Sequence, residues 1–124
     1  MAATTNTTLL KGRFLDITLG EDGSSGTDWY PAQSCALGFG PHDYLIVKSI
    51  TFYPSAANDI IVIQDSTDNT DLDGPAIWIY KAAAIAGEHV KYFDPPQRMR
   101  PTLDMTDQTL SGTSGTARLI FELA

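Results

Sequence analysis

Apolar and polar residues alternate along several short stretches of the chain, which is the pattern of half-buried β-strands. In residues 11–19, for example, Leu15, Ile17 and Leu19 lie on one side of an extended chain and polar residues lie on the other. One side of residues 116–123 is also apolar, with Ala117, Leu119, Phe121 and Leu123, so this last strand should lie inside a sheet. The pattern predicts eight strands, at residues 11–19, 29–36, 44–53, 60–64, 76–80, 88–93, 98–103 and 116–123.

Loops rich in Gly, Pro, Asp and Ser separate these strands, and no helix longer than two turns is expected between them. Many short strands without long helices are typical of all-β sandwiches and barrels. We therefore expect an all-β fold, a single-domain antiparallel β-sandwich of about eight strands with a jelly-roll-like arrangement.

The spacing of the strands predicts some of their neighbours. Residues 44–53 and 60–64 are joined by a short segment, so they are expected to pair as an antiparallel hairpin. Residues 76–80 are apolar on both faces and are expected at the centre of a sheet. Residues 94–97 should form a turn, and Pro101 places the following strand at an edge or a bulge.

The first residues of the chain differ from the rest. Residues 1–9 are rich in Thr and Ala and show no alternation, so they predict an extended N-terminal arm. The remaining residues, 10–124, form the β-sandwich domain, since a chain of this length fits one domain. The arm is either a disordered terminus or a segment that orders against a neighbouring subunit, because an extended segment can add to the edge of a sheet.

Composition narrows the class of partner. Eight Lys and Arg residues stand against fifteen Asp and Glu, which gives a net charge of −7. This balance argues against nucleic acid or an anionic membrane surface as the main partner. No apolar run is long enough for a membrane span, and no secretory signal is expected. Most acidic residues lie in or beside predicted turns, so the charge describes a solvated loop surface over a β core.

One loop partly matches a calcium-binding motif. Asn69, Asp71 and Asp73 stand at alternate positions before Gly74, as in the first half of an EF-hand loop. Position twelve of that motif would be Tyr80 where a bidentate Glu is needed, and the flanking segments are strands instead of helices. We therefore expect a solvated acidic loop and no metal, with a loose cation site at these three residues as the alternative.

The chain carries no recognisable catalytic signature. Its single cysteine, Cys35, has no adjacent base, and the two histidines are scattered, so neither a nucleophile nor a transition-metal site is expected. We expect no catalytic residue, no cofactor and no enzymatic activity. Aromatic residues in or beside loops, Trp29, Tyr30 and Phe39 among them, could instead stack on a sugar or pack at the rim of the core.

A resemblance adds to this interpretation. Residues 47–66 comprise a strand, a short Pro/Asn turn and an Ile/Val strand that ends in Asp65 and Ser66, and a Trp-bearing strand follows at residues 77–80. This layout, with the apolar final strand, resembles small all-β virion proteins of tailed bacteriophages. The resemblance covers residues 44–123 and is one of pattern.

The resemblance implies a non-enzymatic virion structural protein. Its leading form is a decoration or cement protein that binds the exterior of the capsid and stabilises it through subunit contacts. The partners would be the major capsid protein or other virion proteins, after synthesis in the host cytoplasm. A homo-oligomer is expected, a trimer by analogy, without nucleic acid or membrane. The candidate contact residues are Leu9, Leu10, Trp29, Tyr30 and Phe39.

Two alternatives remain open from the sequence. The protein could be a head–tail adaptor or a tail or fibre component. It could also be a β-sandwich module that binds a carbohydrate or calcium.

Overall fold

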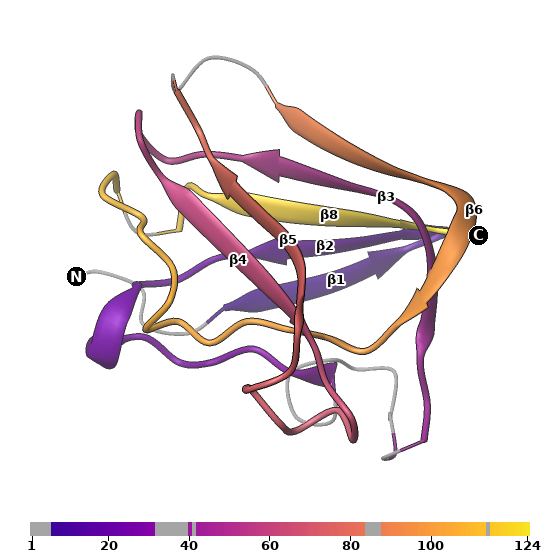
Figure 1. Ribbon diagram of the computed structural model, residues 1–124. Helices are drawn as coiled ribbons and strands as arrows, with labels where there is room; N and C mark the ends of the chain where they lie inside the picture. The colour runs from indigo at the N-terminus through magenta and orange to yellow at the C-terminus, as the bar shows by residue number, and fades with distance from the viewer. Residues whose placement is uncertain (1–5, 32–39, 41, 84–87, 114) are drawn as a thin grey trace.

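The computed structural model describes residues 6–31, 40, 42–83, 88–113 and 115–124. These residues form eight strands in two antiparallel sheets and one short 3-10 turn, Gly23–Ser25 (Figure 1). The prediction of an all-β chain with about eight strands is confirmed. The strands are β1 (Thr7–Lys11), β2 (Phe14–Thr18), β3 (Leu45–Tyr53), β4 (Ile60–Asp65), β5 (Ala76–Lys81), β6 (His89–Met99), β7 (Pro101–Thr102) and β8 (Arg118–Leu123).

The larger sheet has five strands in the order β1-β2-β8-β3-β6, and every neighbouring pair is antiparallel. The final strand β8 lies inside this sheet, between β2 and β3, as its apolar pattern predicts. Leu119 is paired with Ile17 on one side and Phe52 on the other, and all three side chains are buried. One face of the sheet is therefore continuously apolar across its three central strands.

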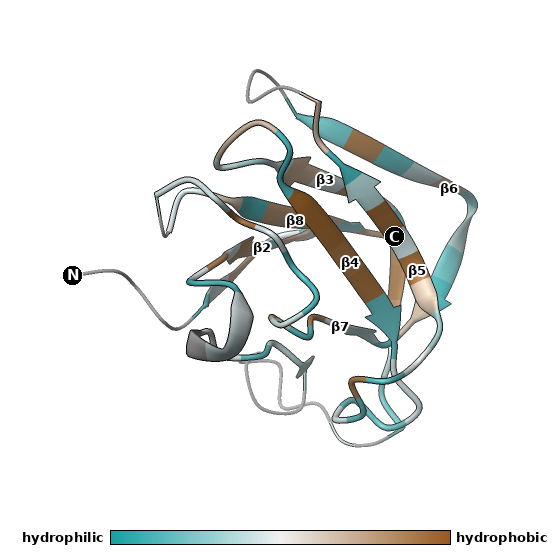
Figure 2. Ribbon diagram, turned by 60° about the vertical axis from the view of Figure 1, so that its left-hand side comes forward, coloured by the Kyte–Doolittle hydropathy of each residue, from teal (hydrophilic) through white to brown (hydrophobic). Residues whose placement is uncertain are grey.

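The smaller sheet has the order β5-β4-β7, and its central strand β4 is the most hydrophobic strand in Figure 2. Because β7 has only two residues, it pairs with one end of β4 only. Beyond it, the side-chain amide of Gln108 substitutes for a strand residue. The Val62 N–H donates to Gln108 Oε1 at 2.7 Å, and Gln108 Nε2 donates to the Val62 carbonyl at 2.8 Å. The backbone of Thr109 then pairs with Ile60, so the edge of β4 is satisfied along most of its length.

The two sheets enclose one apolar core, with β4 and β5 lying across the strands of the larger sheet (Figure 1). The largest fully buried side chains are Trp29, Phe52 and Phe121. The rings of Trp29 and Phe121 stack at 6.5 Å between centroids. Trp29 forms an isolated backbone bridge to Leu103. The sequence predicts a strand at residues 29–36, and this bridge is its only strand-like pairing in the described residues.

Two predictions of strand neighbours are wrong. β3 and β4 do not form a hairpin, because β3 pairs with β6 and β8 whereas β4 belongs to the other sheet. The connecting segment, residues 54–59, therefore crosses from one sheet to the other. β5 is an edge strand instead of a central one. Its outward residue Ile79 is 62% exposed, so apolar residues on both faces of this strand do not indicate burial on both faces.

The turn predicted at residues 94–97 is a bulge within β6. Tyr92 pairs with Ser49 and Gln97 pairs with Val47, so four residues of β6 lie opposite one residue of β3. Pro95 and Pro96 lie in this segment. A proline has no backbone N–H to donate to a neighbouring strand, and residues in a bulge do not need to donate one. β6 therefore continues as one strand through a sequence that is typical of a turn.

The predicted N-terminal arm is also corrected. Thr7–Lys11 forms β1, which pairs with β2 of the same chain along its whole length. The Asn6 side chain donates to the Thr27 carbonyl and accepts from the Gly20 N–H, both at 2.8 Å. Trp29 Nε1 donates to Thr8 Oγ1 at 2.8 Å. β1 shows no apolar alternation because most of its residues are exposed; residues 1–5 lie outside the described part.

A buried carboxylate holds the crossing between the sheets. Asp59 is fully buried and accepts hydrogen bonds from the backbone and hydroxyl of Ser55, the backbone of Ala56, and the backbone and hydroxyl of Ser111. Burial acts to raise the pKa of Asp59, but these hydrogen bonds outweigh it, so the pKa lies below its ordinary value of 3.8. The carboxylate is therefore charged and ties the turn after β3 to the loop before β8.

We expect Asp59→Asn to lower the free energy of unfolding by about 2–3 kcal/mol at pH 7, because an amide cannot accept from all these donors. A folded-state pKa below the unfolded one stabilises the protein above the unfolded pKa, and this stabilisation is lost as the pH falls through the folded pKa. Urea unfolding at pH 7 and pH 3 should therefore show a smaller loss of stability on acidification for Asp59→Asn than for the wild type. Equal losses in both proteins would contradict this role, and the exposed Asp73→Asn is the matched control.

Candidate interaction surface

The face of the five-stranded sheet that is turned away from the core carries most of the exposed large apolar side chains. Directly opposed residues of antiparallel strands point to the same side of a sheet, so the register assigns each residue to a face. Of the eight such side chains in the described residues, six lie on this face: Leu9, Phe14, Tyr44, Ile46, Val90 and Tyr92. We call this surface, together with its charged residues, the outer sheet face.

The apolar residues lie in neighbouring rows of the sheet. One row runs from Leu9 in β1 across to Val90 in β6, and the next contains Phe14 and Tyr92. Phe14 is 47% exposed and Tyr92 is 75% exposed. Single exposed apolar residues are normal, but a group of them on one uncovered face makes this face a candidate binding surface.

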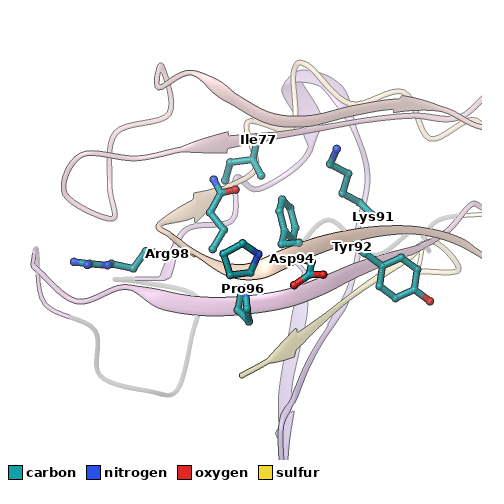
Figure 3. Close-up of a pocket in the computed structure, with 9 residues that line it drawn as sticks. Ile77, Lys91, Tyr92, Asp94, Pro96 and Arg98 are labelled. Carbon is teal, nitrogen blue, oxygen red and sulfur yellow. The ribbon is translucent and has the colours of Figure 1, made fainter.

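The bulge in β6 hollows this face. A depression of about 430 Å³ lies where residues 93–96 leave β3, and its walls are formed by Lys48, Tyr92, Phe93, Asp94, Pro96 and Glu122. A second depression of about 620 Å³ lies on the other side of β6, between β6 and β5. Figure 3 shows Ile77, Lys91 and Tyr92 among the residues that line this second depression, with Ile77 on β5 and the other two on β6. The bulge thus offers a recess on each side of the strand.

Two carboxylates on the outer sheet face, Asp16 and Glu122, are already paired, whereas the exposed Asp94 in the wall of the depression forms no ion pair in the described residues. Arg118 binds both carboxylate oxygens of Asp16, and this hydrogen bonding raises the pKa of Arg118. Glu122 accepts a hydrogen bond from Ser49 Oγ at 3.1 Å, and the Lys48 ammonium lies 3.9 Å from it. Because both acids are occupied within the face, they are not available to bind cations of a partner.

Charge is distributed unevenly over the molecule. The strands of the five-stranded sheet contain five of the eight Lys and Arg residues and three of the fifteen Asp and Glu residues, a formal charge of +2. The rest of the chain carries −9. The overall charge of −7 therefore hides a sheet that is cationic and loops that are strongly anionic.

Part of the loop charge is concentrated in one place. Burial raises the pKa of Asp107, and so does its proximity to Asp104, Asp73 and Asp28. We call these four residues the acidic edge. Asp28 and Asp104 use their carboxylates in the loop, where they accept from the backbone of Met105 and Thr106. The carboxylates of Asp73 and Asp107 hold no such hydrogen bond in the described residues and face solvent.

The structure separates the contact residues predicted from the sequence. Leu9 is 50% exposed on the outer sheet face, and Leu10 is 46% exposed on the opposite side of β1. Trp29 is fully buried, so its proposed role as a contact residue, or as a platform for a sugar, is wrong in this fold. Tyr30 is half-buried, and Phe39 lies outside the described residues. Loop position suggested an exposed ring at Trp29, but the bridge to Leu103 draws it into the core.

Two of the three residues of the candidate calcium loop, Asn69 and Asp71, form side-chain hydrogen bonds to the loops, although the buried Asn69 Oδ1 has no hydrogen-bond partner in the described residues. Asn69 is buried, and its Nδ2 donates to the carbonyls of Gly40 and Asp43 at 2.7 and 2.9 Å. Asp71 Oδ1 accepts from the Asp73 N–H at 3.0 Å. In the part of the chain that the structure describes, no group of three or more His, Cys, Asp or Glu side chains is placed to hold a metal ion.

Comparisons with models of known protein families, with curated proteins and with solved structures gave no match. In the described residues there is also no helix that is long and apolar enough to cross a membrane.

If the outer sheet face serves binding, its apolar residues should be dispensable for folding. We expect Tyr92→Ser to change the free energy of unfolding by no more than about 0.5 kcal/mol, as for other exposed positions. Trp29→Ala should cost about 3–5 kcal/mol, because it empties a filled core position. Urea unfolding monitored by circular dichroism measures both changes, and a comparable cost for Tyr92→Ser would show that this ring belongs to the core.

Proposed function

We propose that the protein is a non-enzymatic structural protein that attaches to other proteins through the outer sheet face. The observation that carries this proposal is the gathering of six exposed large apolar side chains on one face of a sheet whose other face packs against the core through its central strands. Desolvating such a face is favourable at about 25 cal/mol for each Å² of apolar surface removed from water, so a partner that covers it gains binding energy.

The order of the strands in the two sheets also bears on the jelly-roll-like arrangement expected from the sequence. Except for β4 and β5, which are consecutive in one sheet, successive segments after β1 alternate between sheets: β2, β3, β6 and β8 lie in the larger sheet, whereas the Trp29 bridge, β4, β5 and β7 lie in or against the smaller one. We therefore propose an eight-stranded jelly roll, with β2-β8-β3-β6 opposite β5-β4-β7 and the Trp29 segment, and with β1 added at one edge. This architecture occurs in viral capsid and lectin domains.

Among structural roles, we propose a decoration or cement protein on the exterior of a tailed-phage head, with the major capsid protein or other virion proteins as partners. The resemblance in sequence pattern supports the virion setting, and an exposed five-stranded sheet face offers a broad surface for attachment to another protein. A stable attachment needs about 800 Å² of surface on each partner. A homo-oligomer, a trimer by analogy, would multiply such contacts.

We expect the purified protein to co-sediment with assembled phage heads from which it has been removed. The double variant Phe14→Ser/Tyr92→Ser should bind at least about tenfold more weakly, because it deletes two apolar contacts. Ile79→Ser is the matched control: Ile79 is 62% exposed, but it lies in the other sheet. Its binding should equal that of the wild type.

Two results would contradict the proposal. If the wild type does not pellet with particles, the virion role fails. If Ile79→Ser weakens binding as much as the double variant does, attachment does not use the outer sheet face. Circular dichroism of each variant verifies that its fold is retained.

A further inference from the structure

The two sheets leave an open cleft between their edge strands β5 and β6. β5 is the edge of the smaller sheet and β6 is the edge of the larger one, so no strand pairing closes the sandwich between them. The two strands meet at one end, where Tyr80 Oη lies 2.8 Å from His89 Nδ1. Farther along, the bulge of β6 borders the depression of about 620 Å³, which we call the lateral cleft.

Two polar side chains of the lateral cleft point away from the outer sheet face. Lys91 is paired with Ile50 and Gln97 is paired with Val47, and both partners are buried on the core side of the larger sheet. Directly opposed residues point to the same side of a sheet, so Lys91 and Gln97 also point to the core side. Both are nevertheless exposed, because the smaller sheet ends at β5. A partner attached to the outer sheet face therefore leaves these two groups accessible.

Apolar side chains form part of the wall of the lateral cleft. Phe93 is half-buried, and the Lys91 ammonium lies 6.0 Å from the centre of its ring. Pro95 is exposed beside it, and Ile77 borders the cleft from β5 (Figure 3). Phe93 and Ile77 also pack against the core, so they are held in place before any ligand arrives. A ligand with a flat apolar side can cover these groups without the cost of ordering them.

Three polar side chains around this apolar wall have no partner within the protein. The Lys91 ammonium donates hydrogen bonds, the Asp94 carboxylate accepts them, and the Gln97 amide does both. None of the three side chains forms a hydrogen bond or an ion pair in the described residues. One positive and one negative charge lie in the set, so it has no excess of either sign. The lateral cleft thus combines a fixed apolar wall with free donors and free acceptors.

This combination selects the chemistry of the ligand. A purely apolar ligand would remove water from the ammonium, carboxylate and amide without replacing its hydrogen bonds, which is costly. A multiply charged anion would be repelled by the Asp94 carboxylate. A pyranose sugar has C–H groups on the face of its ring and hydroxyl groups at the rim, and each hydroxyl both donates and accepts hydrogen bonds.

We propose that the lateral cleft binds a neutral pyranose sugar. The ring covers Phe93 and Pro95, while its hydroxyls accept from Lys91, donate to Asp94 and do both with Gln97. The volume of about 620 Å³ lies within the range of small-molecule sites. This inference goes beyond the proposed function. It also differs from a sugar stacked on Trp29, because that ring is buried and the exposed wall is at Phe93 and Pro95.

Saturation-transfer NMR with the full chain tests the proposal. The probes are glucose, galactose, mannose and N-acetylglucosamine, each at about 10 mM, with glucuronic acid as the charged comparison. At least one neutral sugar should receive saturation, with a Kd on the order of 1 mM, because the ligand has few atoms. Raising the salt to about 0.5 M should change this Kd by less than about twofold, since a neutral ligand has no charge to screen.

Variants locate the site. Lys91→Met/Asp94→Ala should weaken binding of the same sugar at least about tenfold, because two hydrogen-bonding groups are replaced by apolar ones. Lys81→Met/Asp73→Ala is the matched control: it makes the same chemical changes at exposed residues that do not line the cleft. The control should bind as the wild type does, and circular dichroism verifies the fold of both variants.

Three results would overturn the inference. The first is that none of the four neutral sugars receives saturation. The second is binding of glucuronic acid alone that is lost in about 0.5 M salt, which would make the cleft an anion site. The third is sugar binding that the cleft variant retains in full, which would place the site elsewhere. The co-sedimentation experiment on the outer sheet face is independent of all three, so the proposed function fails or holds separately.

Discussion

Each of the two sheets can bury only one of its faces, because the described chain contains no helix long enough to cover the other. The inner faces meet around Trp29, Phe52 and Phe121, and this contact sets the rest of the structure. The chain has to cross repeatedly between the sheets, and Asp59 and Gln108 satisfy the backbone where the crossings leave strands short. The outer face of the larger sheet is left to solvent or to a partner. Apolar residues there have no function in the monomer's core.

The acidic character of the chain takes on a different meaning in this fold. The loops at the sheet ends hold most of the carboxylates, many of which shape turns: Asp68, for example, accepts from the backbone of Thr70 and Asp71. These hydrogen bonds, first that of Thr70, lower the pKa of Asp68. The larger sheet is left with a small excess of cations. Turn-forming carboxylates in the loops and basic residues in the larger sheet thus separate the charges between two parts of the molecule.

The sequence predicts burial better than it predicts neighbours. Alternation correctly identifies the inward residues of β2, β3 and β8, because it reports directly which side chains avoid water. Alternation does not reveal that β3 and β4 belong to different sheets, because a short connecting segment can either form a hairpin within one sheet or cross to the other sheet. It misses β1, an exposed edge strand without alternation. Of the exposed residues on the outer sheet face, the sequence analysis names Leu9 as a contact candidate but not Tyr92, whose outward position follows from its pairing with Ser49 beside the bulge.

The central claim is that another protein covers the outer sheet face when this protein is attached to a particle. Hydroxyl-radical footprinting with mass spectrometry measures side-chain exposure in the free and the particle-bound protein. The account predicts that oxidation of Phe14 and Tyr92 falls several-fold on binding, while oxidation of Ile79, on the other sheet, is unchanged. Protection of Ile79 with Tyr92 still fully reactive would contradict the account.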